Sequence, residues 1–250
     1  MSLFFGLLGM SVAASMSYAE RIASLEPLCW FRMGQASGTT VVDEMGGASM
    51  TLSGTGITHG VADPIEDDAD TATQFDGSSG GGSVPLDLTP FEAISVEFWA
   101  YQAAWSNDDR VFMEHTPNTN NYFGGWFVDP NTSVNANFTV RIRANTGHPG
   151  IANDIAIFRP TAAAWHHYVI TFDLSETSDI IKIYVDGVLQ TYSKAVGSAV
   201  TSFANSTLYI GHRGESGGLR LNGRLDEIAI YPYMLTPTQI LGNYNAGIGA

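Results

Sequence analysis

The stretch 165–193 constrains the fold most, because it carries the strongest local pattern of the chain. Its first part, WHHYVITFD, is rich in the β-branched and aromatic residues that favour strands. The polar residues 173–179 are typical of a turn, and 180–185 predict a returning strand. Asp186-Gly187 then suits a type I′ turn, because both residues tolerate positive φ. The stretch therefore predicts a three-stranded antiparallel meander.

Seven motifs extend this pattern along the chain. The later ones are WHHYVITFD, IKIYVDGVLQ, LYIGHR and GRLDEIAIYPYMLTPTQI, and the earlier ones are PLCWFRMGQASGTTVVDEMGG, ATQFDGSSGGGSVP and ISVEFWAY. In this order they resemble the LamG-like jelly-roll domains of the concanavalin A-like lectin/glucanase superfamily. The resemblance spans roughly 18–246 and implies an all-β fold, a two-sheet antiparallel jelly-roll sandwich. It implies little about function, because this fold carries lectins, adhesion modules and hydrolases.

Both ends of the expected domain carry the signature of a short helix. Ser17 and Glu20 have the spacing of a capping box, in which each side chain satisfies a free backbone amide. Thr236 and Gln239 repeat this spacing, with Pro237 at the first helical position. We therefore expect short N- and C-terminal helices on the sandwich.

The chain divides into an apolar extension at 1–16 and a LamG-like domain at 17–250. The run LFFGLLGMSVAA is too short to span a bilayer as a helix, and its length suits a signal peptide cleaved after Ala19. No Lys or Arg precedes the run, which is atypical of signal peptides. We expect residues 1–15 to anchor the domain to other proteins of a particle. A signal peptide and a hydrophobic first strand stay open as alternatives.

The charge balance excludes some partners. The formal net charge is −14, with 11 Lys and Arg spread over the chain, whereas phosphate binding needs clustered basic side chains. We therefore expect neither nucleic acid nor an anionic membrane surface as a partner. The densest acidic run, DPIEDDAD at 63–70, is expected to be a solvated loop, with a calcium site as the alternative. The single cysteine, Cys29, lies in an apolar run and is expected to be buried.

The loop 43–48 is the main candidate for calcium binding. In the resembled domains, this loop and the acidic pair that matches 226–227 can hold Ca²⁺ through carboxylate and backbone oxygens. The resemblance thus implies Asp43, Gly46 and Asp226 as ligands. The alternative is a plain turn in which Asp43 caps local amides.

The carboxylates do not form a catalytic pair in the sequence. Hydrolases of the resembled superfamily need two carboxylates on one strand face, one as acid and one as nucleophile. In the expected strand 94–101, Glu97 is the single carboxylate. Asp226 and Glu227 are adjacent, so we expect them to face opposite ways on a strand. We therefore predict no catalytic residues and no enzymatic activity.

The irregular stretch 105–127 is the candidate for glycan or partner binding. Sugars stack on aromatic rings and form hydrogen bonds with amides, and this stretch mixes the two kinds of side chain. The predicted binding residues are Trp105, Asn120, Asn121, Tyr122 and Trp126. The alternative is a loop whose aromatic side chains turn inward to close the edge of the sandwich.

These features predict a non-catalytic binding or structural module displayed on a surface. The first hypothesis is a phage virion component, a decoration, fibre or tail protein in a homo- or hetero-oligomeric assembly, with adhesion to surface polysaccharide. The second is a secreted carbohydrate-binding domain. The third is a divergent glycoside hydrolase that depends on Glu97. The expected location is a virion surface or the extracellular space.

Overall fold

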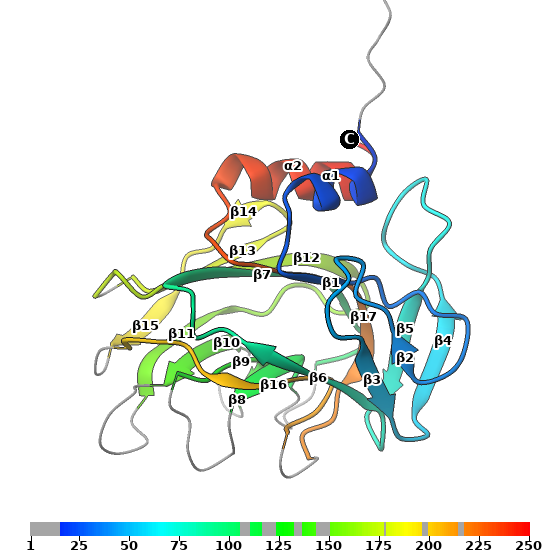
Figure 1. Ribbon diagram of the computed structural model, residues 1–250, viewed down its shortest axis with the longest axis horizontal. Helices are drawn as coiled ribbons and strands as arrows, with labels where there is room; N and C mark the ends of the chain where they lie inside the picture. The colour runs from blue at the N-terminus through cyan, green and yellow to red at the C-terminus, as the bar shows by residue number, and fades with distance from the viewer. Residues whose placement is uncertain are drawn as a thin grey trace, which may run out of the picture.

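Figure 1 shows the computed structural model, a sandwich of two antiparallel sheets with two helices packed on one of them. The structure describes residues 16–105, 111–116, 124–132, 137–143, 151–177, 179–196, 200–214 and 218–250. The predicted all-β jelly-roll sandwich with short terminal helices is confirmed. Residues 1–15, the predicted anchor, lie outside the described ranges.

Within the described ranges, the sheet beneath the helices has eight strands. Their order is β14-β13-β12-β7-β17-β5-β4, and β1 pairs with β17. The bounds are β1 (Cys29–Phe31), β4 (Ile57–Val61), β5 (Ala72–Asp76), β7 (Ala93–Gln102), β12 (Trp165–Asp173), β13 (Ile181–Val185), β14 (Val188–Leu189) and β17 (Asn222–Tyr231). Strand β7 lies between β12 and β17, and nearly all of its residues are buried, so both faces of the sheet are covered here.

The opposite sheet has nine strands in the part of the chain that the structure describes. Their order is β15-β11-β10-β9-β8-β16-β6-β3-β2. The bounds are β2 (Thr40–Val41), β3 (Met50–Ser53), β6 (Gly81–Asp87), β8 (Met113–Thr116), β9 (Trp126–Thr132), β10 (Asn137–Arg143), β11 (Ile151–Phe158), β15 (Ser193–Val196) and β16 (Asn205–Ile210).

The predicted meander is formed by β12, β13 and β14. Strand β12 pairs with β13, and the turn after β13 has φ of 50° at Asp186 and 77° at Gly187, as a type I′ turn requires. The third strand is shorter than predicted. Only Val188 and Leu189 pair with β13, and the chain then crosses to the other sheet at Ser193.

Aromatic rings from both sheets fill the space between them. Tyr168 on β12 stacks on Phe98 of β7 at 5.1 Å and on Phe138 of β10 at 4.9 Å between ring centroids. All three side chains are buried, and each stabilises the fold by roughly 1.5–3 kcal/mol through removal of apolar surface from water. Cys29 is also buried in this core and carries a free thiol, as predicted.

A second apolar layer lies between the eight-stranded sheet and the two helices (Figure 1). Helix α1 (Tyr18–Ser24) and helix α2 (Pro237–Gly247) both begin with the predicted capping box. Ile22 and Ile240 are fully buried against the sheet. In the described residues, no helix is long and apolar enough to cross a bilayer.

Candidate functional site

The outer face of the eight-stranded sheet carries a carboxylate, Glu97, beneath the helices. Side chains of β7 alternate, so Val96 and Phe98 enter the core of the sandwich while Trp99 packs against the helices. Glu97 shares the helix-covered face with Trp99 and with His167, which lies opposite Trp99 on β12. Glu97 is the single carboxylate that the sequence predicted for this strand.

Donors from three other elements converge on Glu97. Tyr231 on β17 donates its hydroxyl to Oε2 at 2.7 Å, and Nε2 of His167 lies 2.7 Å from Oε1. Asn243 of α2 donates its amide to both oxygens, at 3.1 and 2.9 Å. Tyr18 of α1 donates to Oε1 over a longer 3.5 Å. The carboxylate is therefore fully hydrogen-bonded by its own protein.

This network also attaches the helices to each other and to the sheet. Nε of Arg21 in α1 donates to Oδ1 of Asn243 in α2 at 2.7 Å, and Trp99 donates its indole N–H to the Tyr18 hydroxyl at 3.2 Å. Burial, followed by the nearby Glu97 charge, raises the pKa of the Tyr18 and Tyr231 hydroxyls well above their usual value. These hydroxyls are therefore permanent donors at neutral pH, which suits a structural network.

The expectation that Asp226 and Glu227 face opposite ways is wrong. Strand β17 has a bulge between Asp226 and Ala229, and Glu227 adopts a positive φ of 50°. The extra residue turns Glu227 to the helix-covered face, where its Oε2 accepts the indole N–H of Trp30 at 2.6 Å. Asp226 shares this face, because it lies opposite Trp99. The bulge therefore brings two adjacent carboxyl groups together.

The acidic run at 63–70 is not simply a solvated loop. Arg32 forms ion pairs with Asp68, with Asp70 at 3.1 Å and with Glu227 at 3.0 Å. The side chains of Asp68 and Asp70 are only 18% and 16% exposed, so the run folds back on the sheet. Local charge density in the sequence could not reveal this, because the arginine lies more than 30 positions away.

Asp226 differs from its neighbours, because neither of its oxygens has a hydrogen-bond partner in the described residues. The side chain is fully buried. Burial, then the charges of Glu227, Asp70 and Asp63, raise its pKa well above the usual value of a carboxyl group. Burial likewise raises the pKa of Glu227 to about 8, against the lowering effect of Arg32.

Asp43, one of the predicted calcium ligands, is used by its own turn. The carboxylate of Asp43 accepts the backbone amides of Trp30, Met45 and Gly47 at 2.8 to 3.0 Å, as in the alternative of a capped turn. Gly46 supplies a positive φ of 82° to this turn. Across the described ranges, no three His, Cys, Asp or Glu side chains are arranged to hold a metal. Of the two predicted carboxylate ligands, Asp226 is the one whose oxygens have no hydrogen-bond partner in the described residues.

Two of the predicted glycan residues, Trp105 and Trp126, lie within the described ranges. Trp126 is fully buried in the core, where its ring lies 5.6 Å from that of Phe172, so its prediction as a sugar-stacking residue is wrong. Trp105 is partly buried, its indole N–H donates to the carbonyl of Pro160 at 2.8 Å, and Arg159 lies over its ring. The predicted residues Asn120, Asn121 and Tyr122 lie outside the described ranges.

A cluster of arginines on the nine-stranded sheet was not predicted. The guanidinium carbons of Arg141, Arg143 and Arg213 lie 5.5, 5.3 and 5.9 Å from the ring centroid of Phe127. We call these three side chains the arginine cluster. The alternation Arg-Ile-Arg at 141–143 is the local signal that places two of them on one strand face. No local sequence signal predicts that Arg213, which lies in a distant loop, joins this cluster.

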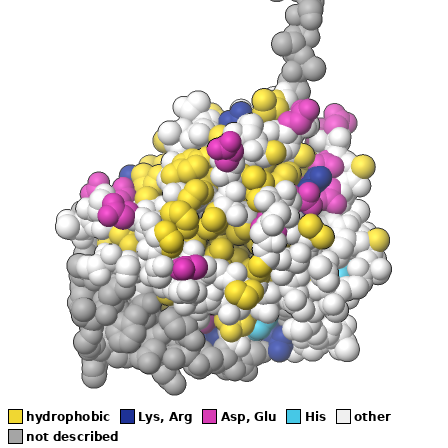
Figure 2. Space-filling model, in the orientation of Figure 1, with side chains coloured by type: hydrophobic (Ala, Val, Ile, Leu, Met, Phe, Trp, Pro, Cys, Tyr) yellow, Lys and Arg dark blue, Asp and Glu magenta, His cyan; other side chains and the backbone are white. Residues whose placement is uncertain are grey.

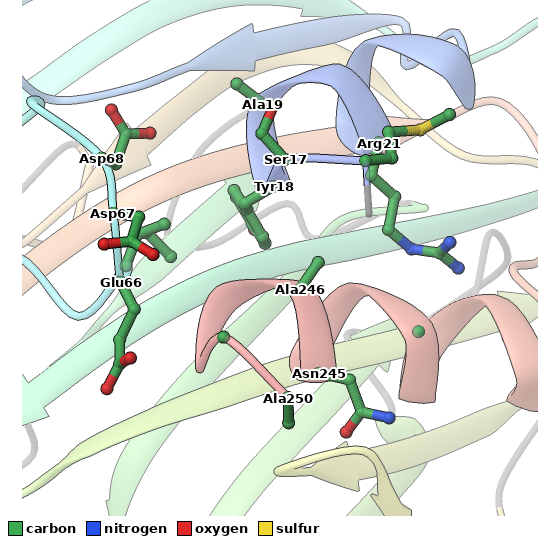
Figure 3. A pocket seen from close by; sticks show the side chains of 14 residues that line it. Ser17, Tyr18, Ala19, Arg21, Glu66, Asp67, Asp68, Asn245, Ala246 and Ala250 are labelled. Atoms are coloured by element: carbon green, nitrogen blue, oxygen red, sulfur yellow. The ribbon is translucent and has the colours of Figure 1, made fainter. Parts of the chain in front are cut away.

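A surface pocket lies elsewhere, at the start of α1 (Figure 3). Its volume is about 770 Å³, and its walls are α1, the C-terminal end of α2 and the loop with Glu66, Asp67 and Asp68. Arg21 lines the pocket but bonds to Asn243. None of the lining side chains has a buried polar atom that lacks a partner. The pocket therefore shows no sign of a built ligand site.

A family model described as the concanavalin A-like lectin/glucanases superfamily matches residues 76–241. The chain belongs to this superfamily. The match includes β7, β12 and β17, so it covers the strands that carry Glu97 and Asp226. A search of curated protein sequences found no match.

Solved structures with the same fold include receptor-binding domains of neurotoxins. The botulinum neurotoxin type G receptor-binding domain has a TM-score of 0.62 at 13% identity, over 88% of this chain and 51% of that one. The binding domain of botulinum neurotoxin DC in complex with rat synaptotagmin II has the same TM-score and coverages at 15% identity. This superfamily member thus spans about half the length of these neighbours.

A catalytic protein is also among the structural neighbours. The Trypanosoma rangeli sialidase in complex with 2,3-difluorosialic acid has a TM-score of 0.59 at 13% identity, over 87% of this chain and 32% of that one. At these identities, the likeness shows a shared fold and nothing more.

Proposed function

We propose that this superfamily member is a non-catalytic binding module, displayed on a surface, whose ligand is a carbohydrate. The observation that supports this most is the closure of the Glu97 face by α1 and α2. A hydrolase needs carboxyl groups that reach the substrate and a water molecule. Glu97 is fully buried and hydrogen-bonded on both oxygens, and Asp226 is fully buried as well. The neurotoxin neighbours, named as receptor-binding domains, are consistent with binding rather than turnover.

The ligand surface in this proposal is the outer face of the nine-stranded sheet. Neither described helix packs there, since both lie on the other sheet. Three guanidinium groups lie around the buried ring of Phe127 on this face, and planar charged side chains are among the groups that sugar recognition uses. The proposed ligand surface also includes residues of the stretch 105–127, namely Trp105 and the predicted Asn120, Asn121 and Tyr122.

We place the domain on a particle, with a phage virion as the first candidate, in a homo- or hetero-oligomeric assembly. Residues 1–15 form an uncharged, largely apolar segment that suits burial in a neighbouring protein. The described chain begins beside α2, where apolar side chains gather on the surface that Figure 2 shows. Val188, Leu189 and Leu241 are 60%, 50% and 45% exposed on this side.

The second candidate is a secreted carbohydrate-binding domain from which the first 19 residues are cleaved. The intact mass of natively produced protein separates the two. A chain that starts at Met1 within a large complex supports the particle, whereas a monomer that starts at Glu20 supports secretion and ends the anchor proposal.

Calcium binding stays a proposal, with Asp226 rather than Asp43 as the residue that would hold the ion. A buried carboxyl group with two unpartnered oxygens fits a hard cation. Glu227, Asp70 and Asp63 are the acidic groups whose charges reach it, and Asp70 lines a small surface pocket with Arg32. When bound, the ion would balance the negative charge of these carboxyl groups.

The binding proposal is tested by screening the natively produced protein against immobilised neutral and acidic polysaccharides, with parallel assays for sugar release. We expect retention of at least one polysaccharide without release of reducing ends. Release that disappears in a Glu97→Gln variant shown to be folded would instead establish the hydrolase alternative. Absence of retention on every polysaccharide would refute carbohydrate as the ligand class.

A further inference from the structure

Exposed apolar side chains gather on and beside α2. Eight large hydrophobic side chains are exposed in the described ranges. Four of them lie on α2 or at its borders, and these are Met16 at 51%, Leu189 at 50%, Leu241 at 45% and Ile248 at 36% exposure. We call these four side chains the apolar track. Single exposed apolar residues are common, whereas a group of them on one surface indicates a contact that covers it.

The part of the track on α2 follows the outward face of the helix. Leu241, Asn245 and Ile248 follow one another at spacings of four and three residues, so their side chains are neighbours on one helical face. The buried residues of α2 lie on the other side of the helix, against the sheet. Leu241 and Ile248 therefore point away from the domain.

Leu189 continues the track from α2 to the edge of the sheet. It lies directly opposite Tyr184, which belongs to the apolar layer beneath the helices, so Leu189 points to the helix side of the sheet. Two residues earlier, Gly187 lies against Leu241, because a Cβ added to this glycine would be only 2.9 Å from Cδ1 of the leucine. The helix and the edge strand thus form one continuous surface.

The pocket at the start of α1 lies at the other end of the track (Figure 3). Met16 lines it together with Asn245 and Ala246 of α2. Ile65 adds a further apolar wall. In the described residues, no lining side chain has a buried polar atom in need of a partner. The pocket therefore suits apolar side chains of a chain segment better than a polar small molecule.

The segment that precedes Met16 joins the domain where the track begins. Residues 1–15 carry no charged side chain and include eight Met, Leu, Phe and Val residues. Fifteen residues span up to about 50 Å when extended, and the stretch of helix from Leu241 to Ile248 is about 10 Å long. The segment is therefore long enough to reach every part of the track on its own domain.

Two physical arguments favour the chain's own segment over a second copy as the occupant of the track. A tethered segment meets a surface of its own domain at an effective concentration of the order of millimolar. Copies of net charge −14 repel one another, whereas residues 1–15 contribute no charged side chain to that repulsion.

We propose that residues 3–14 dock on the apolar track of their own domain before assembly. The segment covers the exposed leucine, isoleucine and methionine side chains, and the track shields the segment from water. The segment leaves the track when a neighbouring protein binds it. This inference rests on the anchor role proposed for residues 1–15 and gives the anchor a binding site in the free protein.

The test measures how fast a water-soluble maleimide labels a cysteine placed on the track of the full chain. Leu241→Cys supplies the thiol on the track, and Val42→Cys supplies a control thiol at a 59% exposed side chain outside it. The native Cys29 is buried, so its thiol does not compete for the reagent. Each variant is made with and without the double substitution Phe4→Asp, Phe5→Asp, which places charges in the segment.

Intact mass and light scattering first establish where the chain starts and whether it is monomeric. We expect Leu241→Cys to be labelled about tenfold more slowly than Val42→Cys, because the docked segment must open before the thiol is reached. The double substitution Phe4→Asp, Phe5→Asp should restore fast labelling of Leu241→Cys and leave Val42→Cys unchanged.

Three outcomes would overturn the inference. Equal labelling of Leu241→Cys with and without the aspartates, in a chain that starts at Met1, would exclude docking and leave the anchor proposal intact. Protection that weakens on dilution would identify a second copy as the occupant of the track. A chain that starts at Glu20 would end the anchor proposal and the docking together, whereas the proposed carbohydrate binding would still stand.

Discussion

Oε1 of Glu97 lies 2.7 Å from Nε2 of His167, and neither side chain is exposed to solvent. A buried carboxylate is costly unless every oxygen is hydrogen-bonded, and here helices α1 and α2 supply donors that the sheet alone lacks. The pair therefore depends on the two helices, and the helices depend on the pair for their position on the sheet.

Glu97→Gln should destabilise the fold strongly. The substituted amide places an N–H₂ group among donors, so at least one buried hydrogen bond is lost. We expect the free energy of unfolding to fall by about 3 kcal/mol. Urea denaturation measures this change, with Glu176→Gln on the surface as the control. A fall no larger than that of the control would contradict the role of Glu97 in the network.

Asn243→Ala should detach α2 from α1 and from Glu97. Asn243 bonds to Arg21 and to both oxygens of Glu97, so its loss leaves buried groups unpaired. We expect a loss of about 2 kcal/mol in unfolding free energy and faster hydrogen exchange in both helices. The matched control is Asn245→Ala on the same helix, where no side-chain hydrogen bond of the described residues is removed. Unchanged exchange in α1 would show that the helices do not depend on this contact.

Stability should fall as the pH rises from about 4.5 to 8, because of Asp226 and Glu227. Their pKa values are raised in the folded state, so the folded protein binds more protons than the unfolded chain in this window. The contribution is present below the unfolded pKa and is lost as the pH passes the folded pKa.

In Asp226→Asn we expect a shallower fall, which thermal unfolding across this pH range would measure. Asp186 raises the pKa of His166, which adds a loss of the same sign above its unfolded value of 6.5. Both proteins share that contribution, so the difference between them reports on Asp226. Parallel pH profiles for the two proteins would argue against a raised pKa at this residue.

Calcium should stabilise the wild-type protein and leave Asp226→Asn unchanged, if the proposed role of Asp226 is correct. An ion that binds only the folded state raises its stability by about 2.7 kcal/mol at a hundredfold excess over the dissociation constant. Thermal unfolding in Ca²⁺ and in EDTA measures the effect. Identical midpoints in the two buffers would end the calcium proposal.

Asp43→Asn should destabilise the protein by about 1 kcal/mol in either buffer, because Asp43 accepts three backbone amides. Asn retains one oxygen acceptor and loses the other, so part of the turn remains bonded. A calcium-dependent effect of this substitution would restore Asp43 as a metal ligand.

Local sequence patterns predicted most of the fold. The strand–turn–strand stretch from β12 to β14 and both capping boxes depend on residues within a few positions of one another, and the structure contains all of them. The third strand of the meander is shorter than predicted, because Val188 and Leu189 are followed by a crossover to the other sheet that no local signal marks.

The candidate sites were less accessible to prediction. Strand alternation misplaced Glu227, because one extra residue in β17 reverses the side that a side chain faces. Trp126 is a residue type that often contacts sugars, yet its side chain on β9 points into the core. Charge density predicts a solvated loop for the acidic run at 63–70, because Arg32, which pairs with Asp68 and Asp70, lies far away in the sequence.

The sequence by itself determined that this chain forms an all-β sandwich with a capped helix at each end, because strand alternation, turn residues and helix caps are properties of neighbouring residues. The tertiary structure alone decided which polar groups are buried and which partners they meet. Glu97 becomes inaccessible through Tyr18 and Asn243, which lie 79 and 146 positions away. The ring of Phe127 likewise contacts Arg213, which lies far away in the sequence. Burial and charge contacts depend on distance in space rather than along the chain.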